Sequence, residues 1–161
     1  MEDPKNTLLI TDKIYTITLE AARVAVKYEK LTGRKLGITG EIGEILTCKN
    51  QELKLSLNPL TAGYDAIDSG GNRYQIKSRR TNHRRGSIGS FSQHSFDYAI
   101  LAILDPNYKI SELRKTSYEK LKPFLDKYPR RNPKFNDFIR VSEVIWVQDN
   151  QEDKNKIPNK V

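Results

Sequence analysis

A nearly unbroken apolar run spans residues 96–105, with the sequence FDYAILAILD, and it constrains the fold more than any other segment. It is too short to cross a bilayer as a helix, but it suits one β-strand that is covered on both faces. Such a strand lies inside a sheet that has a layer of structure on each side. The chain of 161 residues is long enough to build one domain of this kind.

Hydrophobic periodicity predicts helices on both sides of this run. Apolar residues recur at helical spacing from Thr18 onward, and Gly33 is the expected end of that helix. The predicted helices cover residues 18–33, 39–50 and 117–128. Polar loops are predicted at residues 81–95 and 129–135.

Strand signals occupy the middle of the chain. Leu53, Leu55 and Leu57 alternate with polar residues, which is the period of a half-buried strand. Further strands are predicted near residues 8–10, at 62–68, at 73–80, at 108–115 as an edge strand, and at 141–147, where a short helix is the alternative. This order favours an α/β fold, a mixed central β-sheet flanked by helices. Residues 1–147 are expected to form a single domain, and residues 148–161 a polar, flexible tail.

The runs at 62–68 and 73–80 flank an S-G-G-N turn and form a predicted β-hairpin. If Ile67 pairs with Arg73, Asp65 faces Gln75, and Gly63 faces Lys77. Side chains alternate along a strand, so Asp65, Gln75 and Lys77 would project from one face. A shift of the register by one residue would move Asp65 to the opposite face.

These residues resemble the core of the PD-(D/E)xK nuclease superfamily, which has the restriction-endonuclease-like fold. The resemblance rests on G-Y-D at 63–65 and on Q-I-K at 75–77, ten residues after Asp65. It also rests on T-G-E-I-G-E-I-L at 39–46, which supplies a helix acid, and on the buried strand that follows. Glu44 fits the helix acid best, and Glu41 is its competitor.

The resemblance implies a Mg²⁺-dependent phosphodiesterase, with Mn²⁺ able to substitute. Asp65, Gln75 and Glu44 would be the metal ligands, and Lys77 would orient or deprotonate the attacking water. Oxygen ligands of this kind suit Mg²⁺, which neutralises phosphate charge and acidifies water. Gln75 stands where the family has an acid, and its amide oxygen can ligate a cation without adding charge.

Two other functions are compatible with the same residues. A catalytically silent member of the fold would bind nucleic acid or a protein partner, with Gln75 marking lost activity. An unrelated basic α+β binding module is the third alternative. Metal dependence separates the nuclease from both.

Charge supports a nucleic-acid partner, with DNA as the expected substrate. The chain carries 28 Lys and Arg against 20 Asp and Glu, a net charge of +8. The predicted phosphate contacts follow Lys77 directly and are Arg79, Arg80, Arg84 and Arg85. A solvated charged loop is the structural alternative for this segment.

The remaining features exclude some classes of protein. The first residues lack the order of a signal peptide, no apolar segment is long enough to span a membrane, and Cys48 is the only cysteine. A cytoplasmic protein with a buried Cys48 is therefore expected. Cutting both strands of a duplex usually needs two sites, which is compatible with a homodimer.

Overall fold

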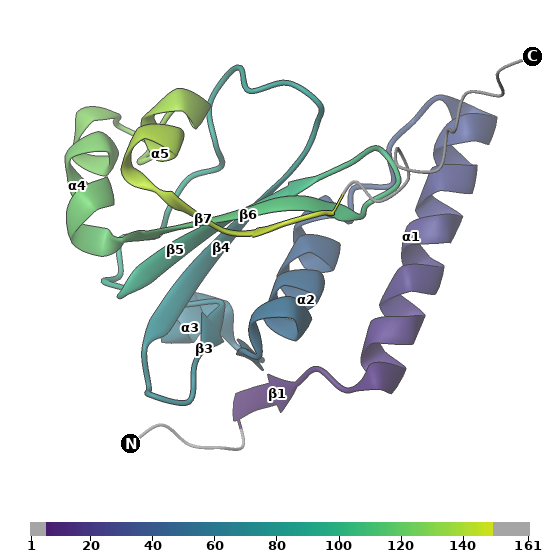
Figure 1. Ribbon diagram of the computed structural model, residues 1–161, viewed down its shortest axis with the longest axis horizontal. Helices are drawn as coiled ribbons and strands as arrows, with labels where there is room; N and C mark the ends of the chain where they lie inside the picture. The colour runs from purple at the N-terminus through teal and green to yellow at the C-terminus, as the bar shows by residue number, and fades with distance from the viewer. Residues whose placement is uncertain (1–5, 150–161) are drawn as a thin grey trace, which may run out of the picture.

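The apolar run forms β5 (Tyr98–Leu104) within a seven-stranded mixed sheet, as seen in the computed structural model, which describes residues 6–149. The strands lie across the sheet in the same order as in the chain. On one side of β5 are β1 (Thr7–Leu9), β2 (Lys54–Ser56), β3 (Ala66–Ile67) and β4 (Arg73–Arg80), and on the other side are β6 (Ile110–Ser117) and β7 (Glu143–Val147). β4 and β5 are parallel, and every other neighbouring pair is antiparallel (Figure 1). The predicted mixed sheet with a buried central strand is confirmed.

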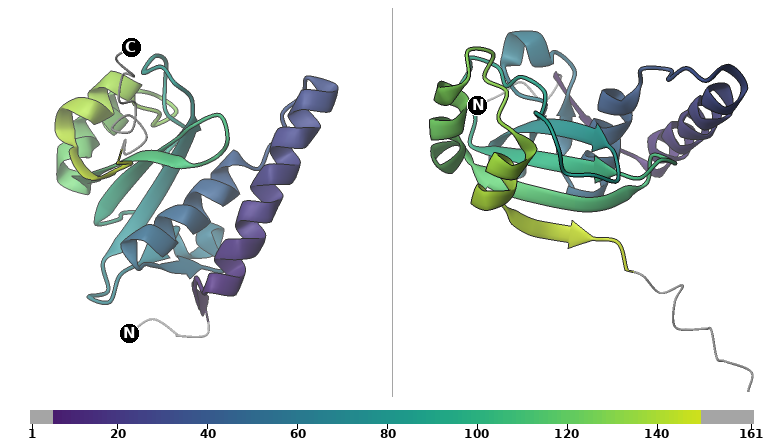
Figure 2. Two further views of the ribbon diagram at one scale, coloured as in Figure 1. Left: turned by 45° about the vertical axis from the view of Figure 1, so that its right-hand side comes forward. Right: turned by 90° about the horizontal axis from the view of Figure 1, so that it is seen from above.

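Helices cover both faces of the sheet (Figures 1 and 2). Their bounds are α1 (Asp12–Thr32), α2 (Thr39–Gln51), α3 (Pro59–Ala62), α4 (Tyr118–Lys127) and α5 (Phe135–Val141). One core joins the sheet to α1 and α2, and a second joins the opposite face to α4, α5 and the segment 81–97. The alternation along β5 divides its side chains between these two cores, which explains why the whole strand is apolar.

Local signals account for where the helices begin and end. The Thr11 Oγ1 accepts a hydrogen bond of 3.3 Å from the Ile14 N–H, so α1 begins before the predicted Thr18. Gly33 ends α1 at φ 69°, a left-handed conformation that glycine adopts without strain. Ser117 caps α4 in the same way as Thr11 caps α1.

Two predicted strands differ from the observed ones, and one helix was missed. Residues 108–115 do not form an edge strand, because β6 pairs with both β5 and β7, and β7 is the edge. The strand predicted over 62–68 is only Ala66–Ile67, because the preceding residues form α3 and Gly63 ends it at φ 78°. Gly63 therefore does not face Lys77. The helix α5 was not predicted.

Two further predictions concern the C-terminal tail and membrane-spanning segments. Residues 148–149 have no regular structure, and the rest of the predicted tail lies outside the described residues. Among residues 6–149, no helix has both the length and the apolar character needed to cross a membrane.

α2 packs very closely against β4 where Gly43 of the helix meets Ser78 of the strand. A Cβ on Gly43 would overlap the Ser78 Oγ and would lie 2.5 Å from the Ser78 Cβ. Only glycine at this position allows α2 to lie where it does. The residue that follows on the helix is Glu44, so this contact also sets the position of the predicted helix acid.

The Gly43→Ala variant is expected to lose about 1–3 kcal/mol of unfolding free energy, because its methyl group has no space beside Ser78. Urea unfolding monitored by circular dichroism measures this loss. The compensating variant Gly43→Ala/Ser78→Gly should recover part of it. A Gly43→Ala protein as stable as the wild type would show that α2 can shift freely on the sheet.

Candidate active site

The hairpin of β3 and β4 has the predicted register. Ile67 pairs with Arg73, and Ala66 pairs with Tyr74. The regular ladder ends there: the Asp65 N–H donates to the Tyr74 carbonyl, and the Ile76 N–H donates to the Asp65 Oδ2, both at 2.8 Å. The Asp65 carboxylate therefore takes the place of a strand carbonyl and is held at the edge of β4.

α2 brings Glu44 to the same edge. Glu44 is half-buried, whereas Glu41 is exposed. Burial, reinforced by the charges of Asp65 and Glu41 and opposed by Lys77, raises the pKa of Glu44 from 4.5 to about 8. Glu44 is therefore the more buried of the two helix acids, and the charges of Asp65, Glu41 and Lys77 all act on its carboxyl group.

The pKa of Asp65 is also shifted by burial. Burial raises the pKa of Asp65, while its hydrogen bond from the Ile76 N–H and the charge of Lys77 act in the opposite direction. One turn after Glu44, the buried Cys48 has a pKa raised to about 12, first by burial and then by Glu44 and Asp65. Cys48 is thus buried, as predicted, and burial keeps its thiol protonated and unreactive.

Lys77 approaches the edge from the other face of the sheet. Its Nζ lies 5.3 Å from the centre of the Phe91 ring, and a Cβ on Gly89 would lie 3.7 Å from its Cδ. The loop of residues 81–95 therefore covers the Lys77 side chain and leaves it half-buried. An ammonium held in this way is restricted in its rotamers and partly shielded from water.

Gln75, the predicted third ligand, is only 3% exposed and is hydrogen-bonded to Ser92 of the same loop. Its Nε2 donates to the Gly63 carbonyl at 3.1 Å and to the Ser92 Oγ, and its Oε1 accepts from the Ser92 N–H at 3.2 Å. Both ends of the amide are hydrogen-bonded, so Gln75 anchors the loop. Its role as a metal ligand remains a prediction.

The four predicted phosphate-binding arginines are not all brought together. Arg79 donates to the carbonyls of Ser87 and Arg85 and so ties the loop to β4. Arg80 lies on the opposite face, where it pairs with Glu29 at 2.7 Å and stacks on Tyr108. Neighbouring residues of a strand point to opposite faces, which explains the separation.

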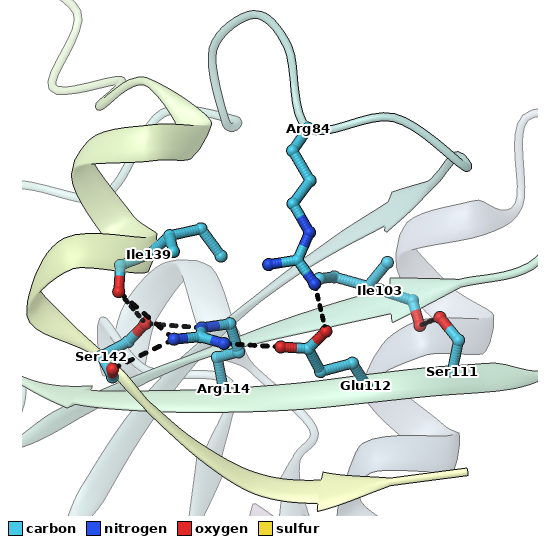
Figure 3. Close-up of polar contacts among 7 residues, drawn as sticks. All are labelled: Arg84, Ile103, Ser111, Glu112, Arg114, Ile139 and Ser142. Carbon is cyan, nitrogen blue, oxygen red and sulfur yellow. Dashed lines mark hydrogen bonds and ion pairs between the residues drawn. The ribbon is translucent and has the colours of Figure 1, made fainter.

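The other two arginines lie on the loop itself and are exposed. Arg84 forms an ion pair with Glu112, whose other oxygen pairs with Arg114 at 2.6 Å (Figure 3). Arg114 in turn donates to Ser142 and Ile139 at the end of α5. Two cations share one carboxylate, so a positive charge remains at this end of the loop. Arg85 has no side-chain ion pair among residues 6–149.

The donor set fits a hard divalent cation. Mg²⁺ commonly takes one or two carboxylates and keeps several waters, which is what Glu44 and Asp65 can offer. Within the described part of the chain, no cluster of three or more His, Cys, Asp or Glu side chains has the arrangement of a metal site. A cation here would therefore rely on two carboxylates, with water or Gln75 completing its shell.

Sequence reasoning missed the residues that hold the loop over the site. Ser92 binds Gln75, Phe91 contacts Lys77, and Arg131 donates to the Ser92 carbonyl. Ile88, Phe91 and Phe96 are buried apolar residues within an otherwise polar segment. Their spacing was the available signal that this loop is attached to a core.

The raised pKa of Glu44 predicts a pH dependence of stability in the absence of divalent cations. Between pH 5 and 8 the folded protein keeps a proton that the unfolded chain has released, so unfolding free energy falls as pH rises. The expected loss is on the order of 2 kcal/mol, because partial exposure reduces the effect. Urea unfolding in EDTA at several pH values measures it.

The Glu44→Gln variant should flatten this dependence and be more stable than the wild type at pH 8, because its amide carries no charge. Glu41→Gln is the matched control, since Glu41 is exposed on the same helix, and it should keep most of the dependence. Parallel curves for wild type and Glu44→Gln would mean that Glu44 is ionised without cost.

No protein-family model and no curated protein matches this chain. The likeness to the PD-(D/E)xK superfamily therefore rests on the residues of this sequence alone: G-Y-D before β3, Q-I-K in β4 and the acids of α2. Among these side chains, Asp65 and Lys77 both act on the carboxyl group of Glu44 through their charges.

Proposed function

We propose that this chain is a divalent-cation-dependent nuclease with a restriction-endonuclease-like core, and that it hydrolyses phosphodiester bonds in DNA. The observation that carries the proposal is that Asp65, bound to the Ile76 N–H just before β3, lies close enough to Glu44 and Lys77 for their charges to interact. Two carboxylates and an ammonium, each from a different element, are the groups that phosphodiester hydrolysis requires.

The order of elements supports the same proposal. α2 supplies the helix acid, and the antiparallel strands β2, β3 and β4 follow it. The buried strand β5 comes next and runs parallel to β4. This is the arrangement that the resemblance implies: an acid on a helix, Asp and Q-x-K on neighbouring strands, and a buried strand after them.

Each residue has a role that its position allows. Asp65 and Glu44 would hold the cation, which neutralises charge on the phosphate and acidifies water when bound. Lys77 would orient the attacking water and stabilise the negative charge that develops on the phosphate oxygens. Water adds its oxygen to phosphorus, one P–O ester bond breaks, and the products are a phosphate monoester and a free hydroxyl end.

One observation favours a second candidate. Both ends of the Gln75 amide are occupied by Gly63 and Ser92, so only two carboxylates are available to a cation. If two are too few, the protein would be a catalytically silent member of the fold that binds nucleic acid or a protein partner. Cleavage assays separate the two candidates directly.

The test is incubation of the purified protein with plasmid, linear and branched DNA in Mg²⁺, Mn²⁺ or EDTA. The Asp65→Asn variant keeps an oxygen that can accept from the Ile76 N–H but loses its charge. It should lose both cleavage and Mn²⁺ binding measured by calorimetry. Asp68→Asn is the matched control on the same hairpin, where Asp68 accepts from Gly70, Asn72 and Tyr74 in the turn, and it should keep both.

Absence of cleavage under all these conditions, together with Asp65-dependent Mn²⁺ binding, would favour the silent candidate. Unchanged Mn²⁺ binding by Asp65→Asn would show that Asp65 is not a ligand. Cleavage that persists in EDTA would contradict a role for a divalent cation.

The loop arginines predict how binding depends on salt. Each phosphate neutralised contributes about −0.9 to the slope of log affinity against log salt on B-DNA. The Arg84→Ala/Arg85→Ala variant should weaken binding on all sequences alike and flatten the slope by roughly one to two units, the smaller value if Glu112 already compensates Arg84. Fluorescence anisotropy at several salt concentrations measures the slope.

The control removes the same charge from another surface. Arg23 and Lys30 are exposed on α1, which packs on the opposite face of the sheet from the loop, so Arg23→Ala/Lys30→Ala should leave the slope nearly unchanged. Equal effects of the two double variants would mean that net charge, and not the loop, attracts the DNA.

A further inference from the structure

The long helix α1 has a second apolar face that the fold does not use. Thr18, Ala22 and Ala25 are buried against the rest of the protein. A separate stripe consists of Ile17, Ala21, Val24, Tyr28 and Leu31. Ile17 is 60% exposed, Val24 59% and Leu31 87%. Views of the molecule place α1 at its outer edge, beside α2, with one flank open (Figure 2).

The spacing of this stripe differs from that of scattered surface residues. Its members alternate at intervals of four and three residues, the repeat of a two-helix coiled-coil seam. Single exposed apolar side chains are ordinary in monomers, but a continuous seam along a helix of 21 residues, about 30 Å, is not. A seam of this length and spacing has the geometry that a second helix could cover.

The charges beside the stripe indicate which helix. Glu20 and Lys27 flank it on the side away from the core, and both are exposed. Neither takes part in an ion pair within residues 6–149. They lie seven residues apart, one heptad, and carry opposite charges. When two copies of this surface face each other in opposite directions, Glu20 of one copy can pair with Lys27 of the other.

We propose that α1 pairs with α1 of a second copy of this chain, antiparallel and around a two-fold axis near Ala21 and Val24. In that arrangement Val24 packs on Ala21 of the second copy, and Tyr28 packs on Ile17. Glu20 of each copy lies beside Lys27 of the other, which gives two symmetric ion pairs.

A parallel pair does not use these charges. Glu20 and Lys27 would then face Ala25 and Thr32 of the second copy, because flanking positions of parallel helices meet five residues apart. Ala25 is buried in the core of its own molecule and cannot reach a partner. The antiparallel arrangement is therefore the one that both covers the apolar seam and pairs Glu20 with Lys27. This inference does not depend on the proposed nuclease activity.

The experiment is sedimentation equilibrium of the full chain between about 1 and 200 µM, since a helix pair of this size should dissociate on dilution. The wild type should reach twice its mass of 18.6 kDa at the upper concentrations. Val24→Glu and Leu31→Glu should remain monomeric while keeping the wild-type circular dichroism spectrum. Leu60→Glu, at a residue that is 93% exposed on α3, is the matched control and should still dimerise.

Charge exchange tests the orientation. Glu20→Lys or Lys27→Glu alone turns two attractive pairs into repulsive ones and should weaken the dimer roughly tenfold or more at low salt. The double variant Glu20→Lys/Lys27→Glu should regain wild-type affinity, and an equal mixture of the two single variants should form a heterodimer. A wild type that stays monomeric throughout, dimers that survive Val24→Glu and Leu31→Glu, or a double variant no stronger than the single ones would each overturn the proposal.

Discussion

The hydrogen bond from the Ile76 N–H to the Asp65 carboxylate is the contact on which the candidate site depends. β3 is short, and beyond Tyr74 the β4 edge has no β3 residue to pair with. A buried backbone N–H without a partner is costly, so the side chain of Asp65 replaces the missing strand carbonyl. The same bond holds the carboxylate at the strand edge that Glu44 and Lys77 reach from opposite faces of the sheet.

Bringing these groups together costs the protein stability. Gly43 allows α2 to pack closely on Ser78, and this closeness places Glu44 where burial and Asp65 both raise its pKa. Two desolvated carboxylates beside each other repel when both are ionised. Such an arrangement is unfavourable for folding alone, and a cation between them would relieve it. This tension is the physical reason for proposing that Glu44 and Asp65 bind a cation.

The loop that covers Lys77 is held by residues of the same strand. Gln75 binds Ser92, Lys77 lies against the ring of Phe91, and Arg79 donates to two loop carbonyls. These three side chains alternate along β4 and so share one face. A polar segment without regular structure is thereby attached to the second core. Two arginines of this loop, Arg84 and Arg85, are left exposed.

Short-range patterns in the sequence determined much of this protein: the buried β5, the helix that carries Glu44, and the register that places Asp65 beside β4. Each depends on neighbours within one or two elements, which periodicity and turn residues encode. Only the tertiary structure decided that Gln75 anchors a loop, that Arg80 pairs with Glu29 away from Arg79, and that β6 is flanked on both sides. Alternation along a strand tells which side chains share a face, but what covers that face comes from segments distant in the chain.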